Sequence, residues 1–293
     1  MPLARGSARQ HRGCNVPERA LKLLALSTST PRGSAALFEA ADVDLHAVAA
    51  ASRGGARSTA GLAAAPAAGA RLLAATTYAD LHGHAERIFG AVDEVLAAAG
   101  LPAAAVQALG CDVGPGSFTG VRVAVAAAKG VALALDVPVA GVTSLEAMAA
   151  AAFAAGAASP GDLVVPLIDA KKGELFLAAF DAPAAAPSIP PRHLPRDAAF
   201  DVVAELAAGR RIVVVGAVAE EIEALRPLAA RGDALDFPDA AWIGRLAIDR
   251  LRAAAAGGER GPAAAPHDPA LLEPLYVRAP DAKPAELGYT PPR

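Results

Sequence analysis

The sequence predicts an α/β protein with two lobes that part near residue 140. Short apolar runs such as RIVVVG have the length of buried strands, and they alternate along the chain with segments of helical period. The length of 293 residues fits one large domain or two domains of ordinary size. Hydrophobic residues make up 54% of the chain and aromatic residues only 4%, so we expect a core built mainly from Leu, Val and Ile.

The first lobe is predicted over residues 21–140. LKLLALS (21–27) has the composition of a buried strand, and SAALFEA (34–40) is predicted to pair with it as a hairpin. An insertion over residues 52–70 is rich in Gly, Ala, Ser and Pro, which predicts a flexible loop. Residues 71–76 predict a short strand.

The strongest amphipathic pattern predicts a helix over residues 80–99. Asp80 can cap its start, Gly100 can close its end, and Pro102 follows. Its apolar positions recur at steps of three and four residues and therefore share one face, namely Leu81, Ala85, Ile88, Val92, Val95 and Ala99, widened by Phe89 and Leu96.

Strand and helix alternate again in the rest of the first lobe. Residues 106–113 predict a strand, residues 119–135 a helix and residues 138–142 another strand. Thr143 or Ser144 can cap the helix that follows.

The second lobe is predicted over residues 141–280. Residues 163–169 and 174–180 predict two strands joined by the tight turn AKKG. Residues 181–196 are rich in Pro and Ala and predict a loop, and residues 211–216 predict a buried strand.

Two helices and an extended segment complete the second lobe. Helices are predicted over residues 219–225 and 240–255, and the sequence leaves open whether the second of them returns to the first lobe. EPLYVR is predicted to be extended. Residues 1–20 are predicted to form a disordered leader and residues 281–293 a tail.

Composition excludes several classes of protein. The net charge of −3 argues against a basic nucleic-acid binder acting alone. Two cysteines, Cys14 and Cys111, without a CxxC or Cys/His cluster predict a reduced protein with no disulfide and no zinc site. The apolar run after the leader is short for a signal peptide, and residues 147–158 are rich in Ala and interrupted by Gly156. We therefore expect a cytoplasmic protein with no membrane segment.

A Gly-rich turn, GPGSFTG (114–120), leads from a predicted strand into a predicted helix. Its three glycines can adopt positive φ, and Ser117 or Thr119 can cap the helix. Unpaired N–H groups at a helix start attract anions, so the turn is compatible with phosphate. It is neither a Walker loop nor a GxGxxG fingerprint. Two interpretations remain open, a phosphate-binding loop and a structural corner between strand and helix.

The helix after this turn carries a strip of small residues. Ala126, Gly130 and Ala134 are spaced four apart and lie on one face. Because a glycine inside a helix costs about 1 kcal/mol relative to alanine, close packing is the expected reason for it. The strip is either buried within its own lobe or packed against a partner chain.

Four blocks together carry a resemblance to a known family. LALSTSTPRGSAAL, GPGSFTGVRVAVAAAKGVALALDVPVAGVTSLEAMA, PLIDAKKGELFLAAF and EPLYVR come in the order and spacing of the TsaB (YeaZ) family. The resemblance implies the two-lobed fold of the actin, sugar-kinase and heat-shock ATPase group, with a duplicated βββαβα unit. It also implies a non-catalytic subunit required to make threonylcarbamoyladenosine (t6A), the modified adenosine next to the tRNA anticodon.

The resemblance also implies partners. In the family, the paralogue TsaD holds the metal and transfers the threonylcarbamoyl group, and the ATPase TsaE joins the complex. The contact with TsaD uses the helices that correspond to 80–99 and 119–135, and the same face is expected to form a homodimer when the chain is alone. A tRNA is expected to bind only through the complex. The interface residues implied here are Leu81, Ala85, Ile88, Phe89, Val92, Arg122, Ala126, Gly130 and Ala134.

The chain departs from the family at the end of its first strand. The family has an Asp there, and this chain has Ser27, which cannot supply the negative charge of a metal–nucleotide site. We therefore expect no catalytic residue, metal or cofactor of its own, and ATP or ADP only at the joint with partner subunits. The degenerate phosphate loop consists of Gly114, Gly116, Ser117 and Thr119.

The alternative hypothesis is a free-standing ATPase or an acyl or sugar kinase of the same fold. His82 and His84 lie two residues apart on a predicted helix and cannot share a metal, so they are expected to be solvated. His46, His193 and His267 have no clustered partners in the sequence. Asp169 and Glu174 flank the AKKG turn and could act as a general acid and base, although a solvated hairpin is the favoured interpretation.

Overall fold

The computed structural model describes residues 20–41, 43–45, 47–48, 69–79, 83–183, 185–207, 209–256 and 268–278. Four predicted features lie outside these residues: nearly all of the leader 1–20, most of the insertion 52–70, the tail 281–293, and the cap at Asp80.

The first lobe is built on a mixed five-stranded sheet with the order β3-β2-β1-β4-β5. β1 pairs with β2 in an antiparallel hairpin, and β1, β4 and β5 run parallel to one another. The carboxyl ends of these parallel strands therefore meet at one edge of the sheet. The strands are β1 (Leu21–Ser27), β2 (Arg32–Ala40), β3 (Ala70–Ala79), β4 (Ala108–Asp112) and β5 (Val139–Val142).

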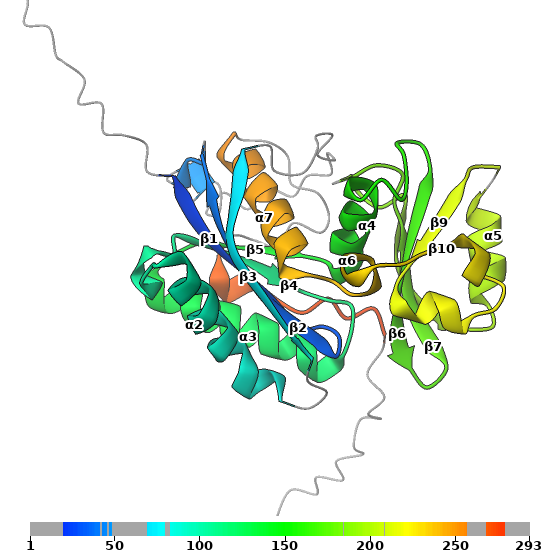
Figure 1. Ribbon diagram of the computed structural model, residues 1–293, viewed down its shortest axis with the longest axis horizontal. Coiled ribbons are helices and arrows are strands. Elements are labelled where there is room, and N and C mark those ends of the chain that lie inside the picture. The colour runs from blue at the N-terminus through cyan, green and yellow to red at the C-terminus, as the bar shows by residue number, and fades with distance from the viewer. Residues whose placement is uncertain are drawn as a thin grey trace, which may run out of the picture.

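Helices cover both faces of this sheet. α2 (His84–Ala99) and α3 (Phe118–Leu135) lie on one face, and α7 (Ala240–Ala255) lies on the other (Figure 1). Strand β1 alternates accordingly, because Leu24 packs toward α2 and α3 while Leu23 packs toward α7. The helix over 240–255 thus returns to the first sheet.

The second lobe has another five-stranded sheet, with the order β10-β9-β6-β7-β8. α4 (Ser144–Ala154) and the short α6 (Asp233–Asp236) pack on one face, and α5 (Ala199–Ala207) packs on the other. The strands are β6 (Leu163–Lys171), β7 (Glu174–Ala179), β8 (Ile189–Pro195), β9 (Ile212–Val215) and β10 (Ala229–Ala230).

Helices α4 and α7 join the two lobes (Figure 1). Ala147 and Ala150 of α4 belong to the core cluster that α7 covers. Arg250 of α7 donates to both carboxylate oxygens of Glu146 on α4, at 2.8 and 2.6 Å. Both contacts come from Nη2 of Arg250, and this charge-assisted pair links the two helices.

Several predicted elements are wrong in detail. Helix α2 begins at His84, after Gly83, which makes no side-chain cap. Residues 181–196, predicted as loop, contain the edge strand β8, where prolines are tolerated because one side needs no ladder hydrogen bonds. Residues 219–225, predicted as a helix, form the 3₁₀ turn Ala217–Glu221 and a non-helical stretch after it. Helix α5 was not predicted.

One described helix, α3, is long and apolar enough to cross a membrane by length and composition alone, although no membrane segment was predicted. Part of α3 packs on the first sheet and is buried there, as in the core helix of any α/β domain. Its composition is therefore weak support for a membrane span.

Two helical glycines give a matched test of the packing. A Cβ on Gly244 of α7 would overlap the buried ring of Phe38, whereas a Cβ on Gly130 of α3 would meet no atom within 4 Å. We expect Gly244→Ala to lower the free energy of unfolding by about 1–3 kcal/mol through overpacking. We expect Gly130→Ala to raise it by about 0.5–1 kcal/mol through helix propensity. Urea unfolding measures both, and equal stability of the two variants would contradict this account of α7.

Candidate functional site

The Gly-rich turn connects the end of β4 to the start of α3. Ser117 is the N-cap residue of α3, and its hydroxyl accepts a hydrogen bond from the Gly120 N–H at 3.3 Å, as predicted. Of the three glycines in the turn, only Gly114 has a positive φ, of 92°. Gly116 and Gly120 do not use the positive φ that glycine permits.

Those two glycines are needed because the turn after β1 lies directly against them. A Cβ on Gly116 would overlap the carbonyl of Ser29, and a Cβ on Gly120 would overlap the carbonyl of Thr28. The Ser117 N–H donates to the Ser29 carbonyl at 2.6 Å, and the Thr28 hydroxyl donates to the Gly120 carbonyl at 2.7 Å. The amide of Ser117, which a phosphate loop would offer to an anion, is thus bonded to the chain itself.

A fully buried carboxylate lies beneath the turn, at Asp112, the last residue of β4. Its Oδ2 accepts hydrogen bonds from the hydroxyls of Ser27 and Ser29, both at 2.6 Å. Its Oδ1 accepts from the Ser144 hydroxyl at 2.6 Å and from the Gly114 N–H at 2.9 Å. One side chain therefore joins the end of β1, the turn after β1, the Gly-rich turn and the start of α4.

Burial raises the pKa of Asp112, while the hydrogen bonds from the three serines and from Gly114 act in the opposite direction. A carboxylate has about four lone-pair positions for acceptance, and four donors occupy them here. The group is fully enclosed, so it is suited to holding segments together and not to binding a ligand from solvent.

Sequence reasoning missed Asp112 and considered only the loss of an acidic residue at Ser27. The two positions are neighbours, since Leu26 and Cys111 pair in parallel register just before them. The neighbouring strand thus supplies a carboxylate at the place where the first strand lacks one. The available signal was an Asp at the carboxyl end of a buried strand, directly before a Gly-rich turn.

The predicted interface residues that the structure describes divide into a buried and an exposed group. Ile88 and Val92 are buried in the core between α2 and the sheet, because the apolar stripe of α2 faces inward, so their side chains are not on the surface of the isolated chain. Leu81 lies outside the described residues. The exposed residues are Ala85, Phe89, Arg122, Ala126, Gly130 and Ala134.

The small-residue strip on α3 is therefore on the surface, and its alternative placement inside the lobe is wrong. A Cβ on Gly90 of α2 or on Gly130 of α3 would meet no atom of the chain within 4 Å. Large apolar side chains share these two helices, with Phe89 50%, Phe118 54% and Leu133 62% exposed. We call the exposed residues of α2 and α3 the α2–α3 face.

Neither described histidine is a free surface group. His84, expected to be solvated, is buried, and its Nε2 lies 2.9 Å from the Thr30 carbonyl. His193 lies on β8, with its Nε2 3.0 Å from Oε2 of Glu174, so it has a partner that the sequence did not indicate. His46, His82 and His267 lie outside the described residues. Within the part of the chain that the structure describes, no group of three His, Cys, Asp or Glu side chains could hold a metal ion.

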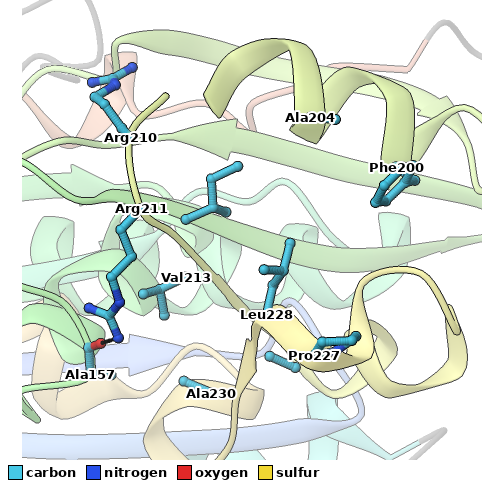
Figure 2. Close-up of a pocket in the computed structure, with 11 residues that line it drawn as sticks. Ala157, Phe200, Ala204, Arg210, Arg211, Val213, Pro227, Leu228 and Ala230 are labelled. Carbon is cyan, nitrogen blue, oxygen red and sulfur yellow. Dashed lines mark hydrogen bonds between the residues drawn. The ribbon is translucent and has the colours of Figure 1, made fainter. Parts of the chain in front are cut away.

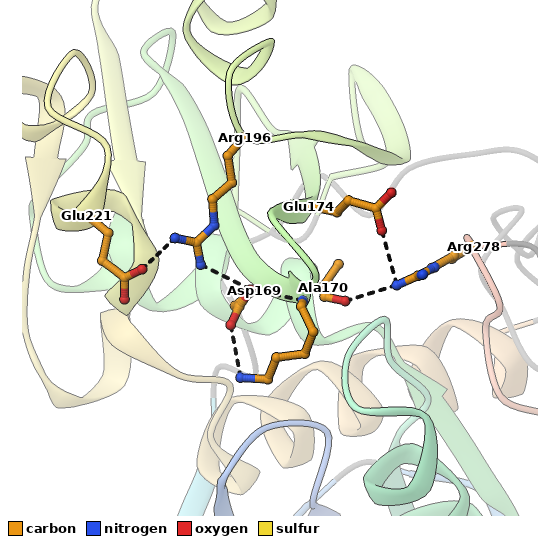
Figure 3. Close-up of polar contacts among 7 residues, drawn as sticks. Asp169, Ala170, Glu174, Arg196, Glu221 and Arg278 are labelled. Atoms are coloured by element: carbon orange, nitrogen blue, oxygen red, sulfur yellow. Dashed lines mark hydrogen bonds and ion pairs between the residues drawn. The ribbon is translucent and has the colours of Figure 1, made fainter. Parts of the chain in front are cut away.

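Asp169 and Glu174 flank the β6–β7 turn but engage different cations (Figure 3). Asp169 pairs with Lys171 at 2.9 Å and with Arg196 at 3.1 Å. Burial acts to raise the pKa of Asp169, but the hydrogen bonds from Lys171 and Arg196 lower it below its ordinary value. Glu174 pairs with Arg278 at 3.1 Å. The two carboxylates thus stabilise the hairpin and its neighbours and do not form an acid–base pair.

A pocket of about 640 Å³ lies in the second lobe, away from the Gly-rich turn (Figure 2). Phe200, Val213 and Leu228 contribute its apolar lining. Its two cations already have partners, since Arg210 pairs with Asp181 and Arg211 with Asp162. The lining offers no further charged group for a ligand.

The buried carboxylate at Asp112 predicts the effect of restoring an acid at position 27. In Ser27→Asp two carboxylates would meet inside the protein, so we expect a loss of about 3–5 kcal/mol in unfolding free energy at pH 7. The pair has raised folded-state pKa values, so the fold loses stability as the pH rises through them, and the loss should be smaller at pH 4.

Two variants separate charge from size in this experiment. Ser27→Asn introduces a side chain of the size of Asp without its charge and should lose less stability at pH 7. Adding Asp112→Ser to Ser27→Asp should recover part of the loss, because one carboxylate remains. Denaturant unfolding at both pH values provides the measurement, and equal losses for Ser27→Asp and Ser27→Asn would show that charge is not the cause.

Parts of the chain are similar in sequence to known proteins. The family model described as TsaD, tRNA N6-adenosine threonylcarbamoyltransferase, matches residues 78–184. The TsaB protein of Haemophilus influenzae, described as a tRNA threonylcarbamoyladenosine biosynthesis protein, is 45% identical over 93 residues, or 32% of this chain and 38% of the relative. TsaB of Escherichia coli is 37% identical over 97 residues, or 33% of this chain and 41% of the relative.

The sequence matches are partial, since the chain spans about two fifths of the length of these two curated relatives. The structural match is more extensive. A solved Pseudomonas aeruginosa protein, described as uncharacterized with similarity to peptidase YEAZ, has a TM-score of 0.62 and 25% identity, covering 88% of this chain and all of that one. The chain is thus similar to the TsaB (YeaZ) proteins, in sequence over about a third of its length and in its two-lobed α/β fold over most of it.

Proposed function

We propose that the chain is a non-catalytic subunit in the threonylcarbamoylation of the adenosine next to the tRNA anticodon. In this proposal it binds and activates a TsaD-type transferase through the α2–α3 face. The names of the TsaB relatives support the process. The match of residues 78–184 to a TsaD model supports a shared fold between the two subunits, as expected for a pair of paralogues.

The exposed α2–α3 face is the observation that carries the proposal. Gly90 and Gly130 both lie inside helices and face open space. Each costs about 1 kcal/mol relative to alanine, and no contact within the described chain explains the cost. Phe89 and Leu133 add large exposed apolar side chains on the same pair of helices. Close approach of helices from another chain would account for both features.

The Gly-rich turn has a structural part in the proposal. It carries the chain from β4 into α3, and its glycines accommodate the turn after β1. The Asp112 carboxylate holds both turns in place. The turn therefore fixes the direction of α3, and any ATP or ADP is proposed to bind at the joint with partner subunits.

Further parts of the proposal follow from the same face. TsaE is proposed as the third subunit, tRNA as a ligand of the assembled complex, and the cytoplasm as the location. An apolar face without its partner tends to pair with itself, so the isolated chain is proposed to form a homodimer through α2 and α3.

Reconstitution tests the proposal directly. The chain is mixed with the TsaD-type and TsaE-type proteins of the same cell, unmodified tRNA, ATP, threonine, bicarbonate as the source of the carbamoyl carbon, and the enzyme that supplies the threonylcarbamoyl adenylate. We expect t6A to form only when the chain is present, and ATP turnover by the chain alone to stay at background. Full modification without the chain would overturn the proposal. ATP turnover by the chain alone would favour the free-standing ATPase or kinase.

A charge on the α2–α3 face should abolish binding without unfolding the lobe. Gly130→Glu places a carboxylate on the strip, and a buried unpaired charge costs several kcal/mol, so we expect the affinity for the TsaD-type partner to fall by at least about 100-fold. Circular dichroism and the thermal midpoint should stay close to wild type, because Gly130 has open space around it.

Ala204→Glu on α5 is the matched control, since Ala204 is an exposed helical residue of the second lobe. It should bind the partner as wild type does in a titration by calorimetry. Wild-type affinity in Gly130→Glu would place the interface elsewhere, and equal loss in both variants would show that the charge acts without regard to position.

A further inference from the structure

Residues 268–278 come after α7 in the chain, begin with the 3₁₀ turn Pro269–Leu271 and return to the first lobe (red in Figure 1). Leu272 is fully buried in the core that α2 and α3 share with the first sheet. Three residues later the Leu275 N–H donates to the Val113 carbonyl at 2.7 Å, directly before the Gly-rich turn. The segment is therefore fixed to the first lobe at two points.

The same segment ends on the second lobe. Val277 packs against the core cluster beneath α4. Arg278 pairs with Oε2 of Glu174 at 3.1 Å and donates to the Ala170 carbonyl at 3.2 Å, both in the β6–β7 hairpin (Figure 3). Two motifs without an assigned role, the DAKKGE turn and the EPLYVR tail, thus contact each other.

Between these anchors Tyr276 lies against the start of α3. Its hydroxyl accepts from Nε of Arg122 at 2.9 Å. The Arg122 guanidinium lies 3.6 Å from the ring centroid of Phe118 and 5.7 Å from that of Tyr276. Phe118 and Tyr276 are 54% and 51% exposed, so the cluster is on the surface and continues the α2–α3 face.

We propose that residues 272–278 form a strap between the lobes, and that Arg278 is a positioning residue for the partner-binding face. The Arg278–Glu174 pair fixes the end of the strap, and so holds Tyr276 against Arg122 and Phe118 two residues earlier. The evidence for the strap consists of contacts within this chain. The partner-binding role rests on the proposed function, and its occupant is the same TsaD-type subunit, because the cluster is continuous with the α2–α3 face.

Breaking the Arg278–Glu174 pair should have a local effect and little effect on global stability. Arg278 and Glu174 are both partly exposed, and such pairs contribute little to global stability. The buried side chain of Leu272 still anchors the segment to the first lobe when the pair is broken. Loss of the pair should therefore loosen residues 275–278 without unfolding either lobe, which separates positioning from general destabilisation.

Hydrogen exchange on the full-length chain without partner tests the strap. We expect Arg278→Met and Glu174→Gln to increase the exchange of amides in residues 272–278, most clearly at Leu275, with unchanged exchange in β1 and α7. Arg278→Lys keeps the charge and should restore most of the protection. Arg211→Met, which breaks the Arg211–Asp162 pair of the same lobe, is the control and should leave the strap unchanged. Wild-type exchange at Leu275 in Arg278→Met would overturn the strap.

Partner affinity tests the positioning role separately. We expect Arg278→Met to weaken binding of the TsaD-type subunit by about 3- to 10-fold, with Arg278→Lys close to wild type and Arg211→Met equal to it. Strong binding that Arg278→Met leaves unchanged would overturn the positioning role. If the wild-type chain does not bind that subunit at all, the proposed function fails, while the exchange result still decides whether the strap exists.

Discussion

The hydrogen bonds to the buried Asp112 carboxylate join four segments of the chain, and the geometry around the Gly-rich turn depends on them. A buried carboxylate is costly unless donors surround it, and here Ser27, Ser29, Ser144 and the Gly114 N–H all donate to it. These donors come from the end of β1, the turn after it, the Gly-rich turn and the start of α4. Each segment would lose a hydrogen-bond partner if the carboxylate moved. The carboxylate therefore fixes the positions of the first sheet, helix α3 and the start of α4 relative to one another.

That arrangement separates the two sides of α2 and α3. Their inner sides bury Ile88, Val92 and Val121 against the sheet, as any amphipathic helix does. The outer side of α3 is unusual, because small and apolar residues take positions where a surface helix normally carries charge, namely Ala126, Gly130, Leu133 and Ala134. The outer side of α2 combines Phe89 and Gly90 with exposed charges. A rigid inner contact and an outer side with an apolar centre and charges around it are the combination that a preorganised protein interface needs. The proposed subunit role depends on this pairing and not on any reactive group.

Much of the fold could be predicted from the sequence, because strong local patterns specify it. The strands from 21–27 to 211–216, the cap at Ser117 and the close of α2 at Gly100 all follow from periodicity and from capping chemistry. Strand β8 could not be predicted in this way. Its prolines are acceptable only at the edge of a sheet, and whether a strand lies at an edge depends on the tertiary structure. The Asp112 site was missed for a similar reason. Residues 27, 29, 112 and 144 come together only through the register of parallel strands. A comparison at position 27 alone shows that the acidic residue is missing, whereas in the folded chain Asp112 of the neighbouring strand places a carboxylate beside Ser27.

The turn after β1 has a consequence for any anion that approaches the start of α3. The carbonyl of Ser29 accepts a hydrogen bond from the Ser117 N–H at 2.6 Å. An anion would therefore have to compete with this carbonyl for the amide. A tethered group competes at an effective concentration that reaches the millimolar range or above, whereas a nucleotide must enter from solution. An anion could use this amide only if residues 28–30 first moved away together with Ser29, which also holds Asp112. Binding of an anion at this turn would therefore require a local rearrangement of the first lobe. The glycines that resemble a phosphate loop make room for the backbone of residues 28–29 of the same chain.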